Sequence, residues 1–315
     1  MPAVSTDLSK LQDSVTRSEH LLPVKPGNEA EIIWACKSKK SKTHLALIYL
    51  HGFTASHEEG MPLHAEFAAR YGMNLYLSRL AGHGLIDKKP FLHLTADSLY
   101  SSAKEALAIG SKIGDSVILM ATSAGGILAL ELAAKETQMP IKALILYSPC
   151  VRIFDSKAWI LGGPWGLDIA RKIIGGKYLV SKRTDTLNAH YWYSRYRIEG
   201  AVAIQLLINS CMDTATFHRV KIPVLTCMYY RDPIHQDSTV STSAIRWMVQ
   251  NLGTSANQKQ LVLIPKAGDH VLACYIRSHD IPAVRKATFD FSEKILGLKP
   301  ILQHQPSCQT NDFNK

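Results

Sequence analysis

Seven short runs of apolar residues are spaced along the chain, each long enough for one β-strand. The later runs are nearly continuous in apolar, β-branched and aromatic residues, which is typical of strands covered on both faces. The expected strands are 31–36, 45–52, 74–79, 116–121, 143–148, 223–230 and 260–265. Segments with helical periodicity separate most of them: 60–72, 95–110, 125–136, 240–253 and 280–297. This alternation predicts an α/β fold, a mostly parallel sheet wrapped by helices, with ligands bound beyond the carboxyl ends of the strands.

One long segment interrupts the alternation. Residues 151–221 have the pattern of helices and loops without a clear strand, and the segment is too long for an ordinary connection. We expect a helical cap inserted into a core made of residues 29–150 and 222–299. Residues 1–28 are expected to form a loosely ordered arm, and residues 300–315 a polar tail.

Composition narrows the class of protein only slightly. The 315 residues are 46% hydrophobic and 20% charged, which is enough apolar content for a sizeable buried core. The first residues lack the basic-then-apolar pattern of a secretory signal, and no apolar run reaches the roughly 18–20 residues needed to cross a bilayer. We therefore expect a cytoplasmic protein without stable membrane insertion.

The formal net charge of +10 raises the question of an acidic partner. Residues 151–221 carry +6 of it, with 11 Lys and Arg against 5 Asp and Glu. The dense basic cluster KSKKSK, at 37–42, lies between two expected strands and is interpreted as a solvated hairpin turn. No nucleic-acid partner is predicted. The six cysteines are scattered without metal-binding spacing, so neither a metal nor a cofactor is expected.

A single serine stands where an apolar run changes abruptly into a helical pattern. The sequence there is Ala121-Thr122-Ser123-Ala124-Gly125, a variant of the G-x-S-x-G nucleophile elbow with alanine in the first slot. Small residues are needed at this turn because the strand and the helix approach each other closely. The alternative is a packing turn that contains a serine without chemical function.

A serine nucleophile requires a base and an acid that orients the base. His270 follows the last expected strand, which is the place of the base in this chain order. The acid is expected in the loop after 223–230, where Asp232 and Asp237 compete. Asp237 is favoured because Ser-Thr-Val and then the next helix follow it, and because it lies 33 residues before the histidine. Asp232 remains the alternative.

Two backbone N–H groups are expected to form the oxyanion hole. One belongs to Ala124, directly after the serine. The other is assigned to Phe53, in the loop after 45–52, where Gly52 allows a sharp turn. His51 and His83 are interpreted as residues that order their loops and take no part in proton transfer.

Together these motifs resemble a known family. The residues that carry the resemblance are His51-Gly52-Phe53, LYLSRLAGHG at 75–84, the Ser123 turn, HYW at 190–192, QDSTVS at 236–241 and His270. Over residues 28–298 the chain resembles the α/β-hydrolase superfamily, and more narrowly capped carboxylesterases and monoacylglycerol-lipase-like hydrolases of bacteria. The resemblance implies a serine esterase that works through a Ser-His-Asp triad and an acyl-enzyme intermediate.

The cap is expected to select the substrate, an ester with an apolar acyl or aryl group. Aromatic residues of the cap are the candidates for its pocket, with packing of the cap against the core as the alternative: Trp159, Trp165, Tyr191, Trp192, Tyr193 and Tyr196. Two other functions stay open. The same triad could pass the acyl group to an alcohol or thiol, and a hydrolase fold with an unreactive serine could serve as a ligand-binding module.

Overall fold

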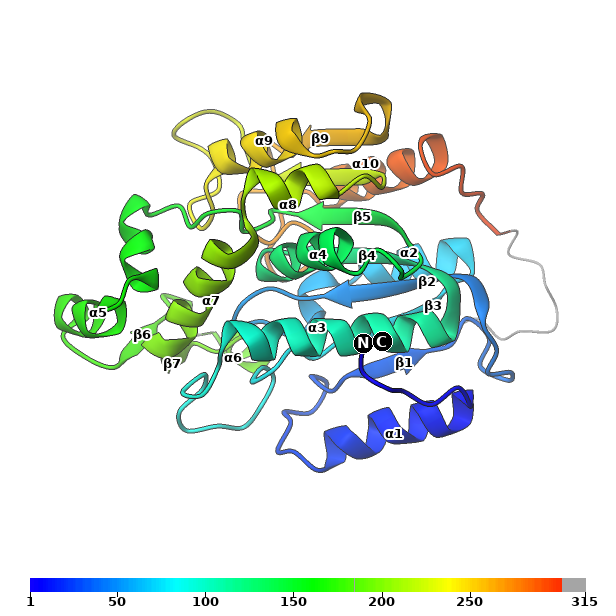
Figure 1. Cartoon of the computed structure of the whole chain (residues 1–315), viewed down its shortest axis with the longest axis horizontal. Coiled ribbons are helices and arrows are strands. Elements are labelled where there is room, and N and C mark those ends of the chain that lie inside the picture. The colour runs from blue at the N-terminus through cyan, green and yellow to red at the C-terminus, as the bar shows by residue number, and fades with distance from the viewer. Residues whose placement is uncertain (184, 302–315) are drawn as a thin grey trace.

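A seven-stranded sheet forms the centre of the molecule (Figure 1). The computed structural model describes residues 1–183 and 185–301. In spatial order the strands are β1, β3, β2, β4, β5, β8 and β9, with β1 antiparallel to β3 and the other neighbours parallel. Their bounds are Glu31–Ile33 (β1), Thr43–Leu50 (β2), Asn74–Leu77 (β3), Gly114–Thr122 (β4), Ile141–Tyr147 (β5), Val224–Met228 (β8) and Lys259–Leu263 (β9). Each coincides with an expected strand, so the predicted α/β class is confirmed.

Helices cover both faces of this sheet. One face carries Leu8–His20 (α1), Ala96–Ile113 (α3), Ala124–Lys135 (α4) and Thr242–Asn251 (α9), and the other carries Leu63–Tyr71 (α2) and Ile281–Lys294 (α10). Side chains of a strand alternate between the faces. In β2 the residues facing the first layer are Ala46, Ile48 and Leu50, and those facing the second are Leu45, Leu47 and Tyr49. Two buried layers therefore hold the carboxyl edge of the sheet rigidly.

The insertion between β5 and β8 lies beyond the carboxyl ends of the strands, on the left of Figure 1. Its helices are Ser156–Gly162 (η2, a 3-10 helix), Gly166–Ile174 (α5), Thr186–Tyr191 (α6), Ile198–Cys211 (α7) and Thr214–Arg219 (α8). It also contains two short antiparallel strands that the sequence analysis missed, Tyr178–Val180 (β6) and Arg195–Arg197 (β7). Three residues are too few to show a period-two pattern. The last helix, α8, packs on α4 and α9 and so belongs to the core.

The N-terminal segment differs from the loosely ordered arm expected there. Helix α1 begins after Asp7, whose carboxylate accepts hydrogen bonds from two backbone N–H groups of the first turn. Leu11 is buried in the core layer. Glu19 forms a buried ion pair with Arg79 at 2.5 Å. The helix is mostly polar, and its narrow apolar stripe gave too weak a periodic signal to be recognised.

The basic cluster KSKKSK does not form a hairpin turn. A hairpin would pair β1 with β2, but β3 lies between them and pairs with both. The cluster therefore belongs to a connection between non-neighbouring strands, and most of its residues are exposed. Of the expected polar tail, 302–315 lie outside the described residues. Within the described part of the chain, no helix has the length and apolar character needed to span a bilayer.

Candidate active site

Ser123 stands at the sharp turn between β4 and α4. Its backbone φ of 53° and ψ of −115° lie outside the regions that a residue with a side chain ordinarily adopts. Gly125 makes the turn possible, because a Cβ there would lie 2.1 Å from the carbonyl oxygen of Leu50. Ala121 is fully buried in β4 between two neighbouring strands, where its methyl group is accommodated. The turn thus has the close strand-to-helix approach expected, and strain of this kind is concentrated at functional sites.

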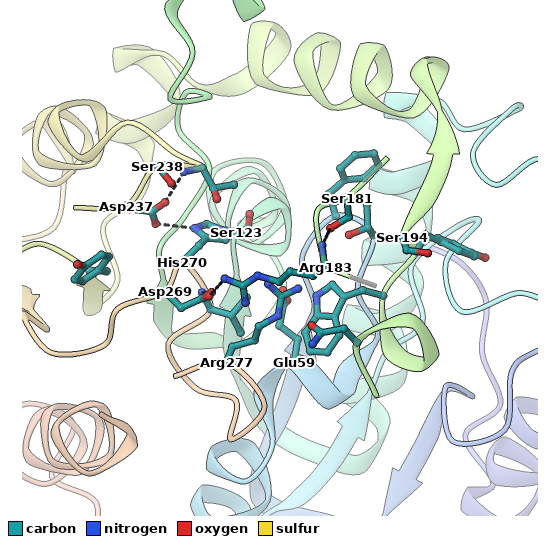
Figure 2. A pocket seen from close by; sticks show the side chains of 18 of the residues that line it. Glu59, Ser123, Ser181, Arg183, Ser194, Asp237, Ser238, Asp269, His270 and Arg277 are labelled. Atoms are coloured by element: carbon teal, nitrogen blue, oxygen red, sulfur yellow. Dashed lines mark hydrogen bonds and ion pairs between the residues drawn. The ribbon is translucent and has the colours of Figure 1, made fainter. Parts of the chain in front are cut away.

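Two loops at the carboxyl edge of the sheet place a histidine and an aspartate near this serine (Figure 2). His270 follows β9, and Asp237 follows β8. The Nδ1 atom of His270 lies 2.6 Å from Oδ2 of Asp237. The other carboxylate oxygen accepts hydrogen bonds from the N–H groups of Thr239 and Val240. The aspartate is therefore held on both sides, and it fixes the orientation of the imidazole ring.

Asp232, the alternative acid, belongs to an exposed turn. Its carboxylate accepts hydrogen bonds from the backbone N–H groups of Ile234 and His235, and it contacts the ring of His235 at 2.9 Å. These hydrogen bonds, first of all the one from the His235 N–H, lower the pKa of Asp232 to about 2. Asp232 has no hydrogen bond or ion pair with His270. Between the two candidates, the structure brings only Asp237 to the histidine.

Burial and charge act in opposite directions on the His270–Asp237 pair. Burial alone lowers the pKa of His270, but the carboxylate of Asp237 more than offsets this and raises the pKa above 6.5. Burial raises the pKa of Asp237, but the charge and hydrogen bond of His270 hold it below 3.8. A carboxylate at Nδ1 keeps the proton of the neutral ring on that atom, so Nε2 is the basic nitrogen. Nε2 is buried without a hydrogen-bond partner among the described residues.

The two backbone groups expected to form an oxyanion hole lie beside the serine. Ala124 is the first residue of α4, where N–H groups have no partner within the helix. Phe53 follows β2, and its side chain borders the same cavities as Ser123. Neither N–H group donates a hydrogen bond to any of the described residues. Their assignment to an oxyanion hole stays a prediction.

His51 and His83 have the loop-ordering roles that the sequence indicated. The Nδ1 of His51 donates to the carbonyl oxygen of Gly52, and its Nε2 accepts from the N–H of Leu80. Burial, above all, holds the pKa of His51 well below its ordinary value. His83 bonds to the carbonyl oxygen of Ala81 and is also fully buried. Both rings are neutral, and their hydrogen bonds hold the loops after β2 and β3 in place.

Glu59 is a buried carboxyl group that the sequence analysis overlooked. One oxygen accepts a hydrogen bond of 2.5 Å from the N–H of Gly52. A Cβ on Gly52 would lie 2.9 Å from both carboxyl oxygens and 3.1 Å from Cβ of Ser123, so the carboxyl group is packed against the loop that contains Gly52 and Phe53. Burial raises the pKa of Glu59 to about 7, although the Gly52 hydrogen bond and the charges of His270 and Arg277 oppose this. The group therefore titrates near neutrality beside the catalytic histidine candidate.

Two cavities of different character meet at Ser123. The polar cavity has a volume of about 430 Å³ and is lined by His270 together with charged and amide side chains: Glu59, Arg183, Asn188, Asp237, Asp269 and Arg277. The apolar cavity has a volume of about 470 Å³ and lies against the cap. Its lining contains Ala124 and aliphatic side chains of η2, α5, β6 and α7: Ile160, Leu161, Ile169, Ile173, Leu179 and Ile204. The site is therefore divided into one charged and one hydrocarbon-like compartment.

The structure divides the six aromatic candidates of the cap. Trp192 and Tyr193 line the polar cavity, and Tyr196 borders both cavities. Contrary to expectation, the other three line neither: Trp159 and Trp165 are 69% and 71% exposed, and Tyr191 packs beside Trp192 and Val271. The apolar wall is instead mostly aliphatic, with side chains from η2, α5, β6 and α7.

A comparison with known proteins agrees with this architecture. Residues 47–284 match the sequence profile of the Alpha/beta hydrolase family. The chain belongs to this family. The matched range contains the serine turn, the aspartate and the histidine, and it runs from β2 into α10. No curated protein matches the chain.

Solved structures with the same fold include several esterases and lipases. One is of LipS and LipT, two metagenome-derived lipolytic enzymes, with a TM-score of 0.67 and 18% identity over 86% of this chain and 99% of that chain. Another is Est1E from Butyrivibrio proteoclasticus with bound ferulic acid, with a TM-score of 0.58 and 20% identity over 85% and 95% of the two chains. A thermophilic esterase from Thermogutta terrifontis has a TM-score of 0.55 and 17% identity over 87% and 97%. At these identities the likeness establishes the fold.

Proposed function

We propose that the protein is a serine hydrolase that cleaves carboxylic esters with an aliphatic acyl chain. The hydrogen bond between His270 and Asp237 carries the proposal, because it leaves Nε2 as a basic nitrogen in the cavity that Ser123 borders. Membership of the Alpha/beta hydrolase family supports hydrolysis. The lipolytic enzymes and esterases with the same fold support an ester as the bond cleaved.

In the proposed acylation step, Oγ of Ser123 attacks the ester carbonyl carbon and Nε2 of His270 takes the hydroxyl proton. Asp237 stays ionised and stabilises the imidazolium ring. The negative charge that develops on the carbonyl oxygen is met by the N–H groups of Ala124 and Phe53. Each of these donors is worth about 2.7–4 kcal/mol of transition-state stabilisation.

The intermediate then collapses with cleavage of the bond to the alcohol oxygen. The imidazolium ring of His270 gives its proton to this oxygen, so the alcohol leaves neutral and the acyl group stays on Ser123. In the second half-reaction His270 takes a proton from water, and the resulting hydroxide attacks the acyl-enzyme. The second intermediate collapses with cleavage of the bond between the acyl carbon and Oγ, and His270 returns its proton to Oγ. The products are the free acid and the regenerated serine.

Labelling with a fluorophosphonate probe tests the nucleophile directly. The wild type should form an adduct at Ser123, and the variants Ser123→Ala and His270→Ala should not. A panel of esters with increasing acyl length should give rising kcat/KM until the apolar cavity is filled. Ala201 lines this cavity, so Ala201→Phe should move the optimum to shorter chains without affecting probe labelling.

The same experiment separates the other functions. A folded wild type that forms no adduct would refute the hydrolase and favour a ligand-binding module. Product analysis in the presence of added alcohols and thiols distinguishes hydrolysis from acyl transfer. Free acid is the expected product, and a predominant transfer product would replace hydrolase by acyltransferase.

A further inference from the structure

The two cavities are placed differently relative to the catalytic groups. His270 lines the polar cavity and not the apolar one, whereas Ala124 lines the apolar cavity and not the polar one. If the proposed function is right, the leaving alcohol receives its proton from Nε2 of His270 and must lie on the histidine side. The alcohol portion of the ester therefore occupies the polar cavity, and the acyl chain occupies the apolar one.

The polar cavity contains an arginine, Arg277, that forms no ion pair with any of the described residues. The guanidinium group of Arg277 lies over the ring of Trp192, 4.7 Å from its centroid. It donates no hydrogen bond to the described residues and forms no ion pair with them, and its Nε is buried without a partner there. Arg277 as a whole is only half-buried, but a buried donor such as its Nε is normally paired, because an unpaired buried donor is costly. Arg277 is thus a preformed cationic site facing the place of the alcohol.

The acidic side chains of the cavity, Asp269 and Glu59, attract Arg277 electrostatically but form no ion pair with it. Arg183 is paired with Asp269 at 2.5 Å, so each of these charges already has its partner. Glu59 bonds to the N–H of Gly52 and forms no ion pair with Arg277. Figure 2 shows Arg277 and Glu59 on the same side of the cavity, with the Arg183–Asp269 pair alongside. The planar guanidinium fork fits a carboxylate or a phosphate with two parallel hydrogen bonds.

We propose that the protein is selective for esters whose alcohol portion carries an anionic group, carboxylate or phosphate, which Arg277 binds in the polar cavity. The stacking on Trp192 holds the guanidinium plane in place for this contact. Arg277 is a specificity residue and takes no part in bond cleavage. A charge-assisted, bidentate contact of this kind should favour the anionic ester over its neutral counterpart by about tenfold or more.

Three octanoyl esters that differ only at the far end of a three-carbon alcohol test the proposal. The alcohols are 1,3-propanediol, 3-hydroxypropanoate and 3-hydroxypropyl phosphate, and released octanoate is measured. The wild type should show the higher kcat/KM for one or both anionic esters, and which of the two is preferred identifies the anion. Added salt should reduce this preference.

Variants separate recognition from structure. Arg277→Met should lose the preference while retaining hydrolysis of the neutral ester, and Arg277→Lys should retain part of it. Arg246 is the matched control, because it also stacks on an aromatic ring, that of Tyr230 at 4.8 Å, and lines neither cavity. Arg246→Met should keep the full preference.

Two results would overturn the inference and leave the proposed function intact. One is a wild type that hydrolyses all three esters equally, and the other is a preference that survives in Arg277→Met. A third result, an equal loss on all three esters in Arg277→Met, would make Arg277 a structural residue and also refute its role in recognition. Failure of the proposed function would give a different result, because then the neutral ester would not be cleaved and the probe would not label Ser123.

Discussion

Glu59 offers a sharp test of the electrostatics of this site. The side chain is 2% exposed, and burial raises its pKa from 4.5 to about 7. Replacement by glutamine keeps the shape and leaves an oxygen that can accept the hydrogen bond from the N–H of Gly52. The substitution therefore removes the ability to ionise with little change in packing.

The expected effect on stability depends on pH in a defined direction. Between about pH 4.5 and pH 7, the unfolded carboxyl group has lost its proton and the folded one has kept it, so the folded state binds more protons. Stability of the wild type relative to Glu59→Gln should fall as the pH rises through this window. The two pKa values of Glu59 differ by about 2.5, and each pH unit corresponds to about 1.36 kcal/mol, so the full effect is about 3 kcal/mol.

Urea unfolding of both proteins at several pH values measures this difference. The difference between the free energies of unfolding, Glu59→Gln minus wild type, should increase by about 2–3 kcal/mol between about pH 5 and about pH 8.5. Effects that do not depend on pH, such as a weaker hydrogen bond, shift the whole curve and do not change its slope. Glu105→Gln, at an exposed position of α3, gives the change caused by losing one surface carboxylate. A flat or opposite difference curve for Glu59→Gln would refute the reasoning.

Three further predictions concern the triad and the turn. Asp237→Asn should lower kcat by about 10³–10⁴, because the imidazole loses its orienting carboxylate. Asp232→Asn should change kcat less than about twofold. Steady-state kinetics measure both effects, and a reversal of the two would contradict the assignment. His270 must be neutral to act as a base, and its pKa is raised, so kcat/KM should rise with pH through a midpoint above 6.5. A midpoint below that value would count against the pairing of His270 with Asp237. Gly125→Ala should lower the free energy of unfolding by about 3 kcal/mol because its methyl group would meet backbone, and an unchanged melting temperature would be inconsistent with the close approach.

Local patterns predicted the parts of the fold that are regular. The apolar runs located all seven strands of the central sheet. The inner strands are buried on both faces and have few polar residues, whereas the edge strands β1 and β9 are partly exposed. The strand-to-helix change at Ser123 and the position of His270 behind the last strand located two chemical groups correctly relative to the sheet. The Ser-Thr-Val sequence after Asp237 and the spacing to His270 favoured Asp237 over Asp232, and in the structure it is Asp237 that contacts His270, at 2.6 Å.

The features that were missed depend on contacts between distant segments. Glu59 lies in an ordinary polar stretch, and its burial against Gly52 and Ser123 comes from the packing of two loops. Arg277 and Trp192 are 85 residues apart in the sequence, and no pattern within either segment indicates that they stack. The prediction of a hairpin at 37–42 was wrong for a similar reason. Strands that follow each other in the chain need not be neighbours in the sheet, and here β3 lies between β1 and β2.

The ion pair between Glu19 and Arg79 bears on where a minimal functional unit begins. The family match starts at residue 47, so a gene shortened to that boundary would lack Glu19. The guanidinium group of Arg79, only 9% exposed, would then be left without its partner, at a cost of about 3–5 kcal/mol. Arg79 also donates a hydrogen bond to the carbonyl oxygen of His83, whose ring packs edge-on against Phe53. Trimming the N-terminus to the family boundary would thus weaken the contacts that hold the loop containing Phe53. Recombinant versions of this hydrolase therefore need to keep their first helix.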